Sequence, residues 1–457
     1  MLSIQKILQK QRQYFESDAT KDISFRFEKL KILKKAVLDN KQKILSALYK
    51  DLKKPEFEAV SSEILMVAEE LNYAIKKLPS FVKPKKVKTP MTHFPAESLI
   101  YNEPYGVVLI IGPWNYPFQL VIDPLIGAIS AGNCAVIKPS EYAPNTSKII
   151  ADIISENFEE EFIAVFEGGL DMSSALLKEK FDYMFFTGSV PVGKIVMKAA
   201  AENLTPLTLE LGGKSPCIID KNVNIEVAAK RIVWGKFFNA GQTCVAPDYV
   251  AVHKDIKKNF LENAKRQIRA FYGENPSVSV DFGRIVNEKH FDRLVNLMKD
   301  GQIIAGGEYE RESLYISPTI IDKVKWDDSI MKEEIFGPIL PVLEYDDLDN
   351  LILNIKKFQK PLSLYIFSND KDIQEKIIKN ISFGGGCVND TLMHLANPHL
   401  PFGGVGESGI GAYHGRANFK TFSHEKSVLN KPFFMDMNLR YPPYKNKQKL
   451  IERMFLK

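Results

Sequence analysis

Apolar residues recur every three or four positions through much of the first hundred residues, with lysines between them. The clearest series are Phe27, Leu30, Leu33 and Val37, followed by Ile44, Leu48 and Leu52. This spacing gathers the apolar side chains on one face of a helix. The pattern therefore predicts a set of packed amphipathic helices in this region.

A second pattern begins near residue 103 and predicts a parallel sheet. Residues 107–111, 135–137 and 183–186 are short, continuous apolar runs of the kind that buried strands show. Helical stretches separate these runs, and the helix after residue 189 has Pro191 in its first turn, where proline is tolerated. Strands that alternate with helices are typical of a doubly wound α/β fold.

Composition limits the number of domains and the kinds of partner that fit this α/β prediction. The chain has 457 residues, of which 45% are hydrophobic and 26% charged, so it can bury a large core in two or three domains. The formal net charge of +5 is too small for this length to indicate a nucleic-acid partner. The basic run at residues 83–88 lacks interleaved aromatic residues, and we interpret it as a solvated connector.

Targeting and metal signals are absent from the sequence pattern. The most apolar stretch, residues 107–137, is interrupted by glycines, prolines and Asp123, so we expect no membrane span. The first residues lack the continuous apolar segment of a secretory signal. The four cysteines have no paired spacing that indicates zinc or disulfides, and the seven histidines show no metal-site spacing. We therefore expect a cytoplasmic protein without a metal.

Three short strings carry the candidate chemistry. Cys244 ends Asn-Ala-Gly-Gln-Thr-Cys, Glu210 lies in Leu-Glu-Leu-Gly-Gly-Lys-Ser-Pro, and Asn115 lies in Pro-Trp-Asn-Tyr-Pro. A free cysteine is by itself more often an inert packing residue, and we interpret the other three cysteines in that way. Glu210 is set between leucines, which is a poor place for a solvated carboxylate. Together the three strings resemble the aldehyde dehydrogenase superfamily.

The chemistry of that family explains these residue types. A cysteine thiolate adds to the aldehyde carbon, and the developing oxyanion needs preorganised donors, here the Asn115 amide and the Cys244 backbone N–H. The adduct then gives its hydride to a nicotinamide cofactor, NAD or NADP, and a thioester remains. The resemblance assigns to Glu210 the activation of the water that hydrolyses this thioester to a carboxylic acid.

The predicted nucleotide site is the turn at residues 188–193, which has the form G-x-x-x-x-G. The turn lacks the middle glycine of the usual dinucleotide fingerprint, and glycines between a strand and a helix often serve only connectivity. Aldehyde dehydrogenases, which this chain resembles, use a looser turn in which the free N-terminus of the helix faces the phosphate. By this resemblance the cofactor-binding residues are Gly188, Ser189, Val192, Gly193, Leu211, Trp114, Lys138, Glu141, Glu334 and Phe336.

The resemblance implies more specific roles for some of these residues. Lys138 and Glu141 follow the strand at 135–137, where open α/β sheets bind ligands, and would hold ribose hydroxyls. Glu141 near a 2′-hydroxyl would repel the 2′-phosphate of NADP, yet the resembling subgroup often accepts both cofactors. Glu334 would hold the nicotinamide ribose, and Phe336 would pack beside the ring.

Further strings narrow the resemblance to the class 3 branch, whose members act on fatty and aromatic aldehydes. These strings lie at residues 247–249, 388–390, 398–406, 411–416 and 440–444. The branch implies an aldehyde dehydrogenase fold with a Rossmann-like cofactor domain, an α/β catalytic domain and a small β oligomerisation arm. The corresponding residues are 1–85 and 105–209, then 210–410, then 86–104 and 411–457 for the arm and bridging segments. It also implies a homodimer and a medium- or long-chain aliphatic or aromatic aldehyde as substrate.

Three other functions share this scaffold. A coenzyme A-acylating dehydrogenase would pass the acyl group to a thiol and would not need a hydrolytic base, so Glu210 argues against it. A reductase of acyl phosphates is disfavoured by the complete set of Asn115, Glu210 and Cys244. A non-catalytic nucleotide-binding protein on the same fold would bind cofactor without turnover.

Overall fold

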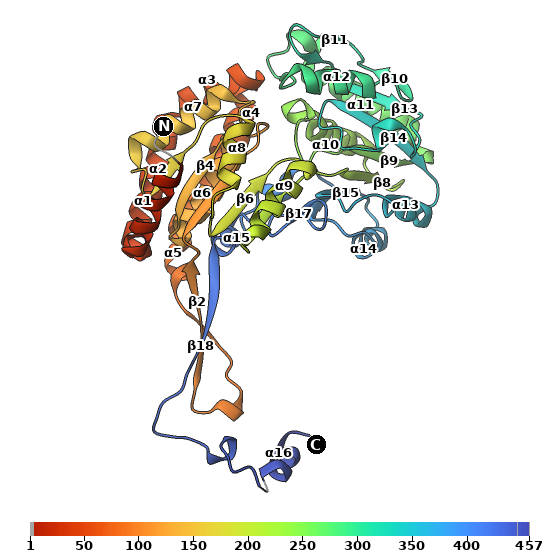
Figure 1. The fold of residues 1–457 in the computed structure, drawn as a ribbon. Helices are drawn as coiled ribbons and strands as arrows, with labels where there is room; N and C mark the ends of the chain where they lie inside the picture. The colour runs from red at the N-terminus through yellow and green to blue at the C-terminus, as the bar shows by residue number, and fades with distance from the viewer. Residues whose placement is uncertain (1–3, 446, 457) are drawn as a thin grey trace.

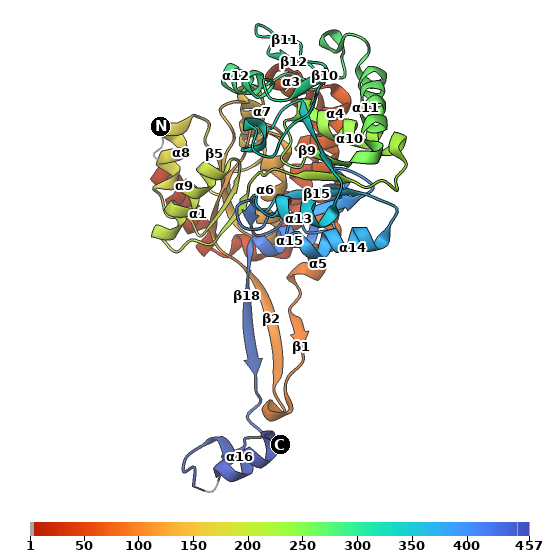
Figure 2. The same ribbon diagram turned by 90° about the vertical axis from the view of Figure 1, so that its right-hand side faces the viewer.

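The computed structural model describes residues 4–445 and 447–456, which form two α/β bodies with a long arm below them (Figures 1 and 2). The chain begins with helices that cover the first body: α1 (Ile4–Glu16), α2 (Ile23–Asp39), α3 (Lys41–Leu52), α4 (Glu56–Ala59) and α5 (Leu65–Val82). A π-helical turn, η2 (Val60–Ile64), joins α4 to α5. Leu30, Leu33, Ile44 and Leu48 are fully buried, so the helical prediction is confirmed as far as Val82.

The first body is built on a six-stranded sheet in the order β17-β7-β6-β3-β4-β5. Its strands are β3 (Val107–Ile111), β4 (Cys134–Lys138), β5 (Ile163–Val165), β6 (Tyr183–Thr187), β7 (Leu207–Glu210) and β17 (Gly409–Ile410). All neighbours are parallel except β17 and β7. The three strands predicted from apolar runs are therefore confirmed.

Crossover helices return the chain between the parallel strands of the first sheet. They are α6 (Gln119–Ala131), α7 (Pro144–Asn157), α8 (Leu170–Leu177) and α9 (Val190–Glu202). Ser189 is the N-cap of α9, and Pro191 lies in its first turn, as predicted. This start matters for the site because Gly188 and Ser189 follow directly from the carboxyl end of β6.

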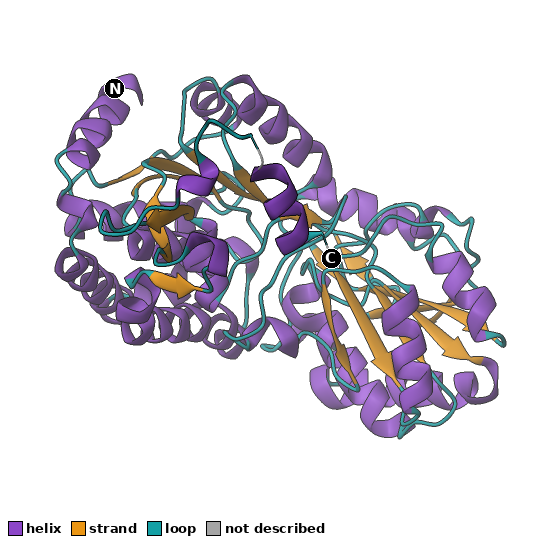
Figure 3. Cartoon of the chain, turned by 90° about the horizontal axis from the view of Figure 1, so that it is seen from below, coloured by secondary structure: helices purple, strands orange, loops and turns teal. Residues whose placement is uncertain are grey.

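The second body is built on a seven-stranded sheet in the order β10-β13-β14-β9-β8-β15-β16, parallel except for β10. Its strands are β8 (Pro216–Ile219), β9 (Tyr249–His253), β10 (Gln302–Ala305), β13 (Thr319–Asp322), β14 (Ile339–Tyr345), β15 (Ser363–Phe367) and β16 (Gly385–Val388). The helices are α10 (Ile225–Phe237), α11 (Lys257–Tyr272), α12 (Glu288–Leu297), α13 (Leu348–Ile355) and α14 (Lys371–Asn380). Figure 3 shows helices packed around the strands of both bodies.

The arm is a separate antiparallel sheet in the order β1-β2-β18. It consists of β1 (Lys85–Val87), β2 (Glu97–Pro104) and β18 (Ser423–Asn430), and the chain continues to α16 (Lys447–Phe455) beyond it (Figure 2). The basic run at 83–88, predicted to be a connector, thus contains an edge strand. Its lysines are solvated, and Lys86 pairs with Glu97 on the neighbouring strand at 2.6 Å.

The chain returns to the first body before it enters the arm for the last time. Helix α15 (Gly415–Thr421) lies against α6, and the Asn418 amide donates to the backbone oxygen of Asp123 at 2.7 Å. The two-stranded β11 (Tyr309–Glu310) and β12 (Tyr315–Ile316) complete the strands of the described chain. None of the helices described is both long and apolar enough to cross a membrane.

Candidate active site

Cys244 lies just after a strained turn between the two bodies. Helix α10 ends at Phe237, and the next residues include Asn239, Ala240 and Gly241 with φ of 54°, 51° and 72°. Asparagine tolerates left-handed backbone, but it is unfavourable for alanine, so the surrounding structure must hold this turn in place. A side chain at Gly241 would collide with the backbone oxygen of Gly337. The turn positions Cys244, which is partly exposed, in the space between the two bodies.

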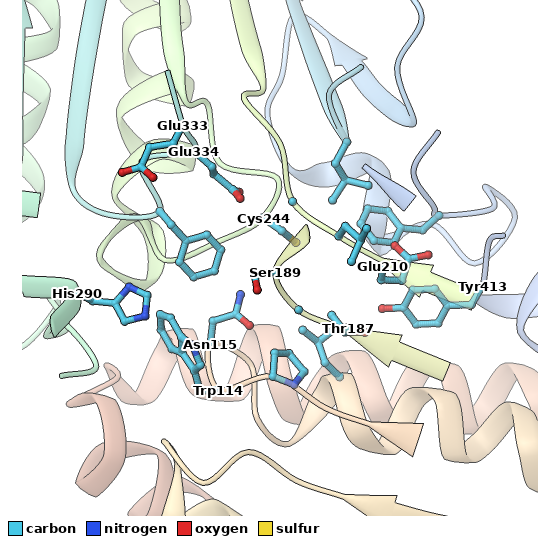
Figure 4. A pocket seen from close by; sticks show the side chains of 18 of the residues that line it. Trp114, Asn115, Thr187, Ser189, Glu210, Cys244, His290, Glu333, Glu334 and Tyr413 are labelled. Atoms are coloured by element: carbon cyan, nitrogen blue, oxygen red, sulfur yellow. The ribbon is translucent and has the colours of Figure 1, made fainter. Parts of the chain in front are cut away.

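Two cavities meet at Cys244. The first has a volume of about 220 Å³ and opens toward the carboxyl ends of the first sheet (Figure 4). The second has a volume of about 310 Å³ and lies on the other side of the sulfur. The residues common to both walls are Leu120, Cys244, Phe402 and Tyr413. A group bound in either cavity can therefore reach the same thiol.

Asn115 and Glu210 border the first cavity beside Cys244, as the sequence predicted (Figure 4). Asn115 is 3% exposed, and its side-chain amide donates to the backbone oxygen of Gln242 at 3.1 Å. Gln242 is two residues before Cys244, so this bond links the amide to the cysteine turn. The arrangement places a neutral hydrogen-bond donor next to the sulfur.

Glu210 ends β7 and is enclosed by apolar neighbours. It is 3% exposed, and neither carboxyl oxygen has a hydrogen-bond partner among the described residues. Burial raises its pKa well above the ordinary value of 4.5, because an ionised carboxylate loses its hydration there. The buried position therefore favours the neutral carboxylic acid form of Glu210 over the carboxylate.

Cys244 is also in its protonated form. Burial raises the pKa of the thiol, and the nearby carboxyls of Glu334 and Glu210 raise it further. Burial likewise raises the pKa of Glu334 to about 8, with Asp248 as a second cause. The thiol and the carboxyls of this site therefore hold their protons more strongly than they would in water.

Six of the ten predicted cofactor residues come together in the first cavity. They are Trp114, Gly188, Ser189, Leu211, Glu334 and Phe336. Gly188 and Ser189 present the N-terminus of α9, where the Ser189 side chain makes no cap and leaves the backbone N–H groups available. Phe336 has a φ of 51° and makes an edge contact with Trp114 at 5.3 Å between ring centroids.

The other four predicted residues lie outside that cavity wall. Lys138 and Glu141 form an ion pair of 2.7 Å just beyond β4. Val192 is 43% exposed on α9. Gly193 lies against Leu211, because a Cβ at Gly193 would approach Leu211 Cδ2 to 2.7 Å. The lack of a side chain at Gly193 thus allows α9 to pack closely on the segment that follows the strand ending in Glu210.

Sequence reasoning missed His290 and Arg293 from α12, which also line the first cavity. The His290 ring lies 5.2 Å from the Trp114 ring, and burial lowers its pKa to about 4, so it is neutral. Arg293 donates to the backbone oxygens of Glu334 and Ile335 at 3.2 and 2.5 Å. No sequence motif around these residues indicates a site, because α12 comes close to Trp114 only in the folded chain.

The second cavity is mostly apolar. Its wall is formed by aromatic and aliphatic side chains together with a few hydroxyl and amide groups. Among its large side chains are those of Phe57, Met66, Tyr116, Trp234, Phe238, Leu392, Met393 and Phe402. Tyr116 borders this cavity, with its hydroxyl 2.6 Å from that of Thr243.

The remaining cysteines are remote from this chemistry. Cys134 and Cys217 are fully buried in β4 and β8, and Cys387 lies 3.5 Å from His394 Nδ1. All four cysteines are free. Across the described part of the chain, His, Cys, Asp and Glu form no group of three or more that is arranged to hold a metal ion.

A profile of the aldehyde dehydrogenase family matches residues 3–428. The chain belongs to the aldehyde dehydrogenase family. It is 52% identical over 444 residues to 4,4'-diaponeurosporen-aldehyde dehydrogenase of Staphylococcus aureus (strain NCTC 8325 / PS 47), covering 97% of each chain. It is 44% identical to the dimeric NADP-preferring aldehyde dehydrogenase of the dog, Canis lupus familiaris, covering 97% of this chain and 98% of that protein.

A solved structure agrees with this assignment. The substrate-bound state of Staphylococcus aureus AldH superimposes with a TM-score of 0.97 at 51% identity, with full coverage of both chains. The chain is also 43% identical over 434 residues to aldehyde dehydrogenase family 3 member A2 of Mus musculus, covering 94% of this chain and 90% of that protein, which places it in the class 3 branch. The solved structure confirms the predicted fold class. This aldehyde dehydrogenase therefore oxidises aldehydes with NAD or NADP.

The first cavity of this aldehyde dehydrogenase fits a nicotinamide dinucleotide. The open N-terminus of α9 suits a phosphate, because its backbone N–H groups and helix dipole favour an anion. The aromatic side chains Trp114 and Phe336 offer flat surfaces near Cys244. Both observations support a cofactor that enters from the side of the first sheet.

Proposed function

We propose that this enzyme oxidises medium- or long-chain aliphatic or aromatic aldehydes to carboxylic acids through a covalent intermediate on Cys244. The observation that carries the proposal is the position of Cys244 where a cofactor-side cavity meets an apolar cavity. An apolar aldehyde tail gains free energy by leaving water for the second cavity. Its carbonyl carbon is then held at the thiol.

The first step forms a thiohemiacetal. The Cys244 thiol gives its proton to a water molecule in the site, its sulfur bonds to the aldehyde carbon, and the electron pair of the carbonyl π bond moves to the oxygen, which becomes an oxyanion. The Asn115 amide and the Cys244 backbone N–H donate to that oxyanion. A bound nicotinamide supplies the hydride acceptor for the adduct carbon. Once the hydride has left, a thioester joins the acyl group to Cys244.

The second step is hydrolysis, for which Glu210 is the general base. Its oxygens have no protein partner in this structure, so they are free to accept a hydrogen bond from water. Water that enters the site hydrates the carboxylate and lowers its pKa toward the working range. Glu210 then takes a proton from the water that attacks the thioester carbon, and the Cys244 thiolate leaves.

Each of the ten predicted cofactor residues has a proposed role, whether it lines the first cavity or lies outside its wall. Gly188 and Ser189 face the pyrophosphate, Lys138 and Glu141 the adenosine ribose, and Glu334 the nicotinamide ribose. Trp114, Leu211 and Phe336 pack near the ring, while Val192 and Gly193 shape the turn.

We also propose the division into a cofactor domain (1–85 and 105–209), a catalytic domain (210–410) and arm or bridging segments (86–104 and 411–457).

The assay that tests this function measures NAD(P)H formation with short, long-chain and aromatic aldehydes, each with and without coenzyme A. We expect turnover to rise from short to long or aromatic substrates and to need no coenzyme A. A strict requirement for coenzyme A would instead favour acyl transfer to a thiol. Cofactor binding without turnover on any aldehyde would favour a non-catalytic protein.

Asn115→Ala is expected to lower kcat by about a hundredfold or more with a modest change in KM, because the amide acts mainly on the oxyanion. Asn115→Asp should be slower still, since it places a negative charge beside a developing negative charge. Steady-state kinetics with one long-chain aldehyde measure both effects. A near-normal kcat in Asn115→Ala would remove Asn115 from the mechanism.

We also propose a cytoplasmic homodimer that assembles through the arm. The arm stands away from both bodies, most of β18 is exposed, and Leu429 is 49% exposed on it (Figures 1 and 2). Such an edge strand invites pairing with another chain. The cytoplasm suits four free cysteines. Sedimentation should give about twice the chain mass of 51.8 kDa, and a monomer at micromolar concentration would contradict the proposal.

A further inference from the structure

Three buried ionisable side chains lie beneath the active-site turns and take no part in the proposed chemistry. Lys54, Glu58 and Glu63 are 1%, 8% and 0% exposed. They come from the short stretch between the end of α3 and the π-helical turn η2. Burying ionisable groups costs free energy unless each one is paired and hydrogen-bonded, so their contacts decide what they do.

Lys54 joins these charges to Asn115. Its ammonium forms a hydrogen-bonded ion pair with Glu63 and donates to the backbone oxygen of Asn115 at 2.9 Å. It also lies 4.2 Å from the centre of the Tyr116 ring, which is a cation–π distance. Lys54 thus contacts both the backbone oxygen of Asn115 and the ring of the next residue, Tyr116.

Glu63 and Glu58 hold the neighbouring segments. One Glu63 oxygen accepts from the backbone N–H groups of Phe118 and Gln119, at 2.9 and 3.1 Å, where α6 begins. Glu58 accepts from the backbone N–H of Asn239 at 2.9 Å. Burial raises the pKa of Glu58 to about 8, so Glu58 is mostly protonated at neutral pH. Burial also lowers the pKa of Lys54, and the neighbouring carboxyls of Glu63 and Glu58 oppose that decrease.

The two segments held in this way are those that carry Asn115 and Cys244. The Asn239 side chain donates to the same Asn115 backbone oxygen at 2.9 Å and to the backbone oxygen of Gln242 at 3.1 Å. Gln242 also accepts the Asn115 amide. Because the next residue, Ala240, has an unfavourable φ of 51°, these bonds oppose relaxation of the cysteine turn.

We propose that Lys54, through its pair with Glu63, is a positioning residue that sets the Asn115 amide against the Cys244 sulfur for formation of the oxyanion. Lys54 borders neither cavity, so it acts through Asn115 and not on the substrate. The π-helical turn contributes by directing Glu63 inward while Ser61 and Ser62 face the second cavity. The inference rests on the proposed roles of Asn115 and Cys244.

The test is the rate of acylation per active site in Lys54→Met, measured by rapid mixing as the burst of reduced nicotinamide. The burst amplitude counts the competent sites, so misfolded protein lowers the amplitude and leaves the rate constant unchanged. We expect the rate constant to fall about tenfold or more, because small displacements of a donor weaken transition-state stabilisation strongly. Cofactor affinity, measured by fluorescence titration, should stay within twofold.

Glu70→Gln is the matched control. Glu70 is a carboxyl on α5 that is 6% exposed, and it accepts from the Gly415 N–H at 2.9 Å and from the Asn418 amide at 2.9 Å. It contacts neither Asn115 nor the cysteine turn in any of these bonds. The control should lose stability, as any buried carboxyl would, and keep its acylation rate constant within twofold of wild type.

The double variant Lys54→Met with Glu63→Gln separates positioning from folding. Removing both charges avoids an unpaired buried carboxylate, so thermal stability should recover relative to Lys54→Met alone. The acylation rate constant should remain low, because the bond to Asn115 is still missing. A rate constant that recovers together with stability would overturn the positioning role.

Further outcomes distinguish a failure of this inference from a failure of the proposed function. If wild type forms no reduced nicotinamide with any aldehyde, or if Cys244→Ala forms it at the wild-type rate, the proposed function fails, whatever the Lys54 variants do. If wild type acylates and Lys54→Met does so at the same rate per site, the inference alone fails. Should Lys54→Met not fold, Glu63→Gln decides by the same measurement: a fall of several-fold supports positioning, and an unchanged rate constant refutes it.

Discussion

Cys244→Ala is expected to abolish aldehyde oxidation, lowering kcat by more than about a thousandfold, while the affinity for NAD(P) is retained. Alanine removes the sulfur that forms both covalent intermediates. It leaves the N-terminus of α9 and the aromatic side chains of the first cavity in place. Steady-state rates and a fluorescence titration with cofactor measure the two properties separately.

The other three cysteines supply the controls for this prediction. Cys387→Ala is the best matched, because Cys387 is partly exposed like Cys244. Cys134→Ala and Cys217→Ala remove fully buried sulfurs and should cost some stability through small cavities. All three variants should keep most of their activity. Substantial turnover by Cys244→Ala would refute the nucleophile assignment.

The regular elements around the site were predictable because local patterns determine them. The spacing of Leu30, Leu33 and Val37 matches one helix face, and that face is buried. The apolar run at 107–111 became a fully buried central strand, as continuous apolar strands of parallel sheets do. Strand ends that share one sheet edge then explain why Glu210 and Gly188 meet at one cavity.

The long-range parts of the site were not predictable from local patterns. His290 and Arg293 lie on an amphipathic helix whose spacing is that of any surface helix. Lys54 and Glu63 look like solvated charges in the sequence, and only the π-helical turn and the return of β3 bury them beside Asn115. The left-handed turn at Asn239 also has no sequence signal beyond the following glycine.

Glu210→Gln is expected to acylate and then stall. Glutamine has the size of the neutral carboxylic acid that the structure favours at this position, so the fold and the cavity should change little. Its amide cannot take a proton from water, and the thioester on Cys244 should persist. Rapid mixing should therefore show a burst of about one reduced nicotinamide per site, followed by very slow turnover.

The pH dependence gives this prediction a second signature. A general base works only when it is deprotonated, and burial raises the pKa of Glu210, so deacylation by wild type should speed up as pH rises toward that pKa. In Glu210→Gln this rise should be lost or replaced by the shallower response to hydroxide. A small thiol added as an alternative acyl acceptor should partly restore turnover, because thiolysis needs no water to be activated.

Intact-mass measurement of the stalled enzyme connects these observations to one residue. The mass of Glu210→Gln should increase by that of the acyl group, and the increase should disappear when Cys244 is also replaced by alanine. A missing burst would show that Glu210 also helps to remove the thiol proton, since the raised pKa of Cys244 requires a proton acceptor for acylation. Normal steady-state acid production by Glu210→Gln would refute its role as the base and return acyl transfer to a thiol as the better account of the chemistry.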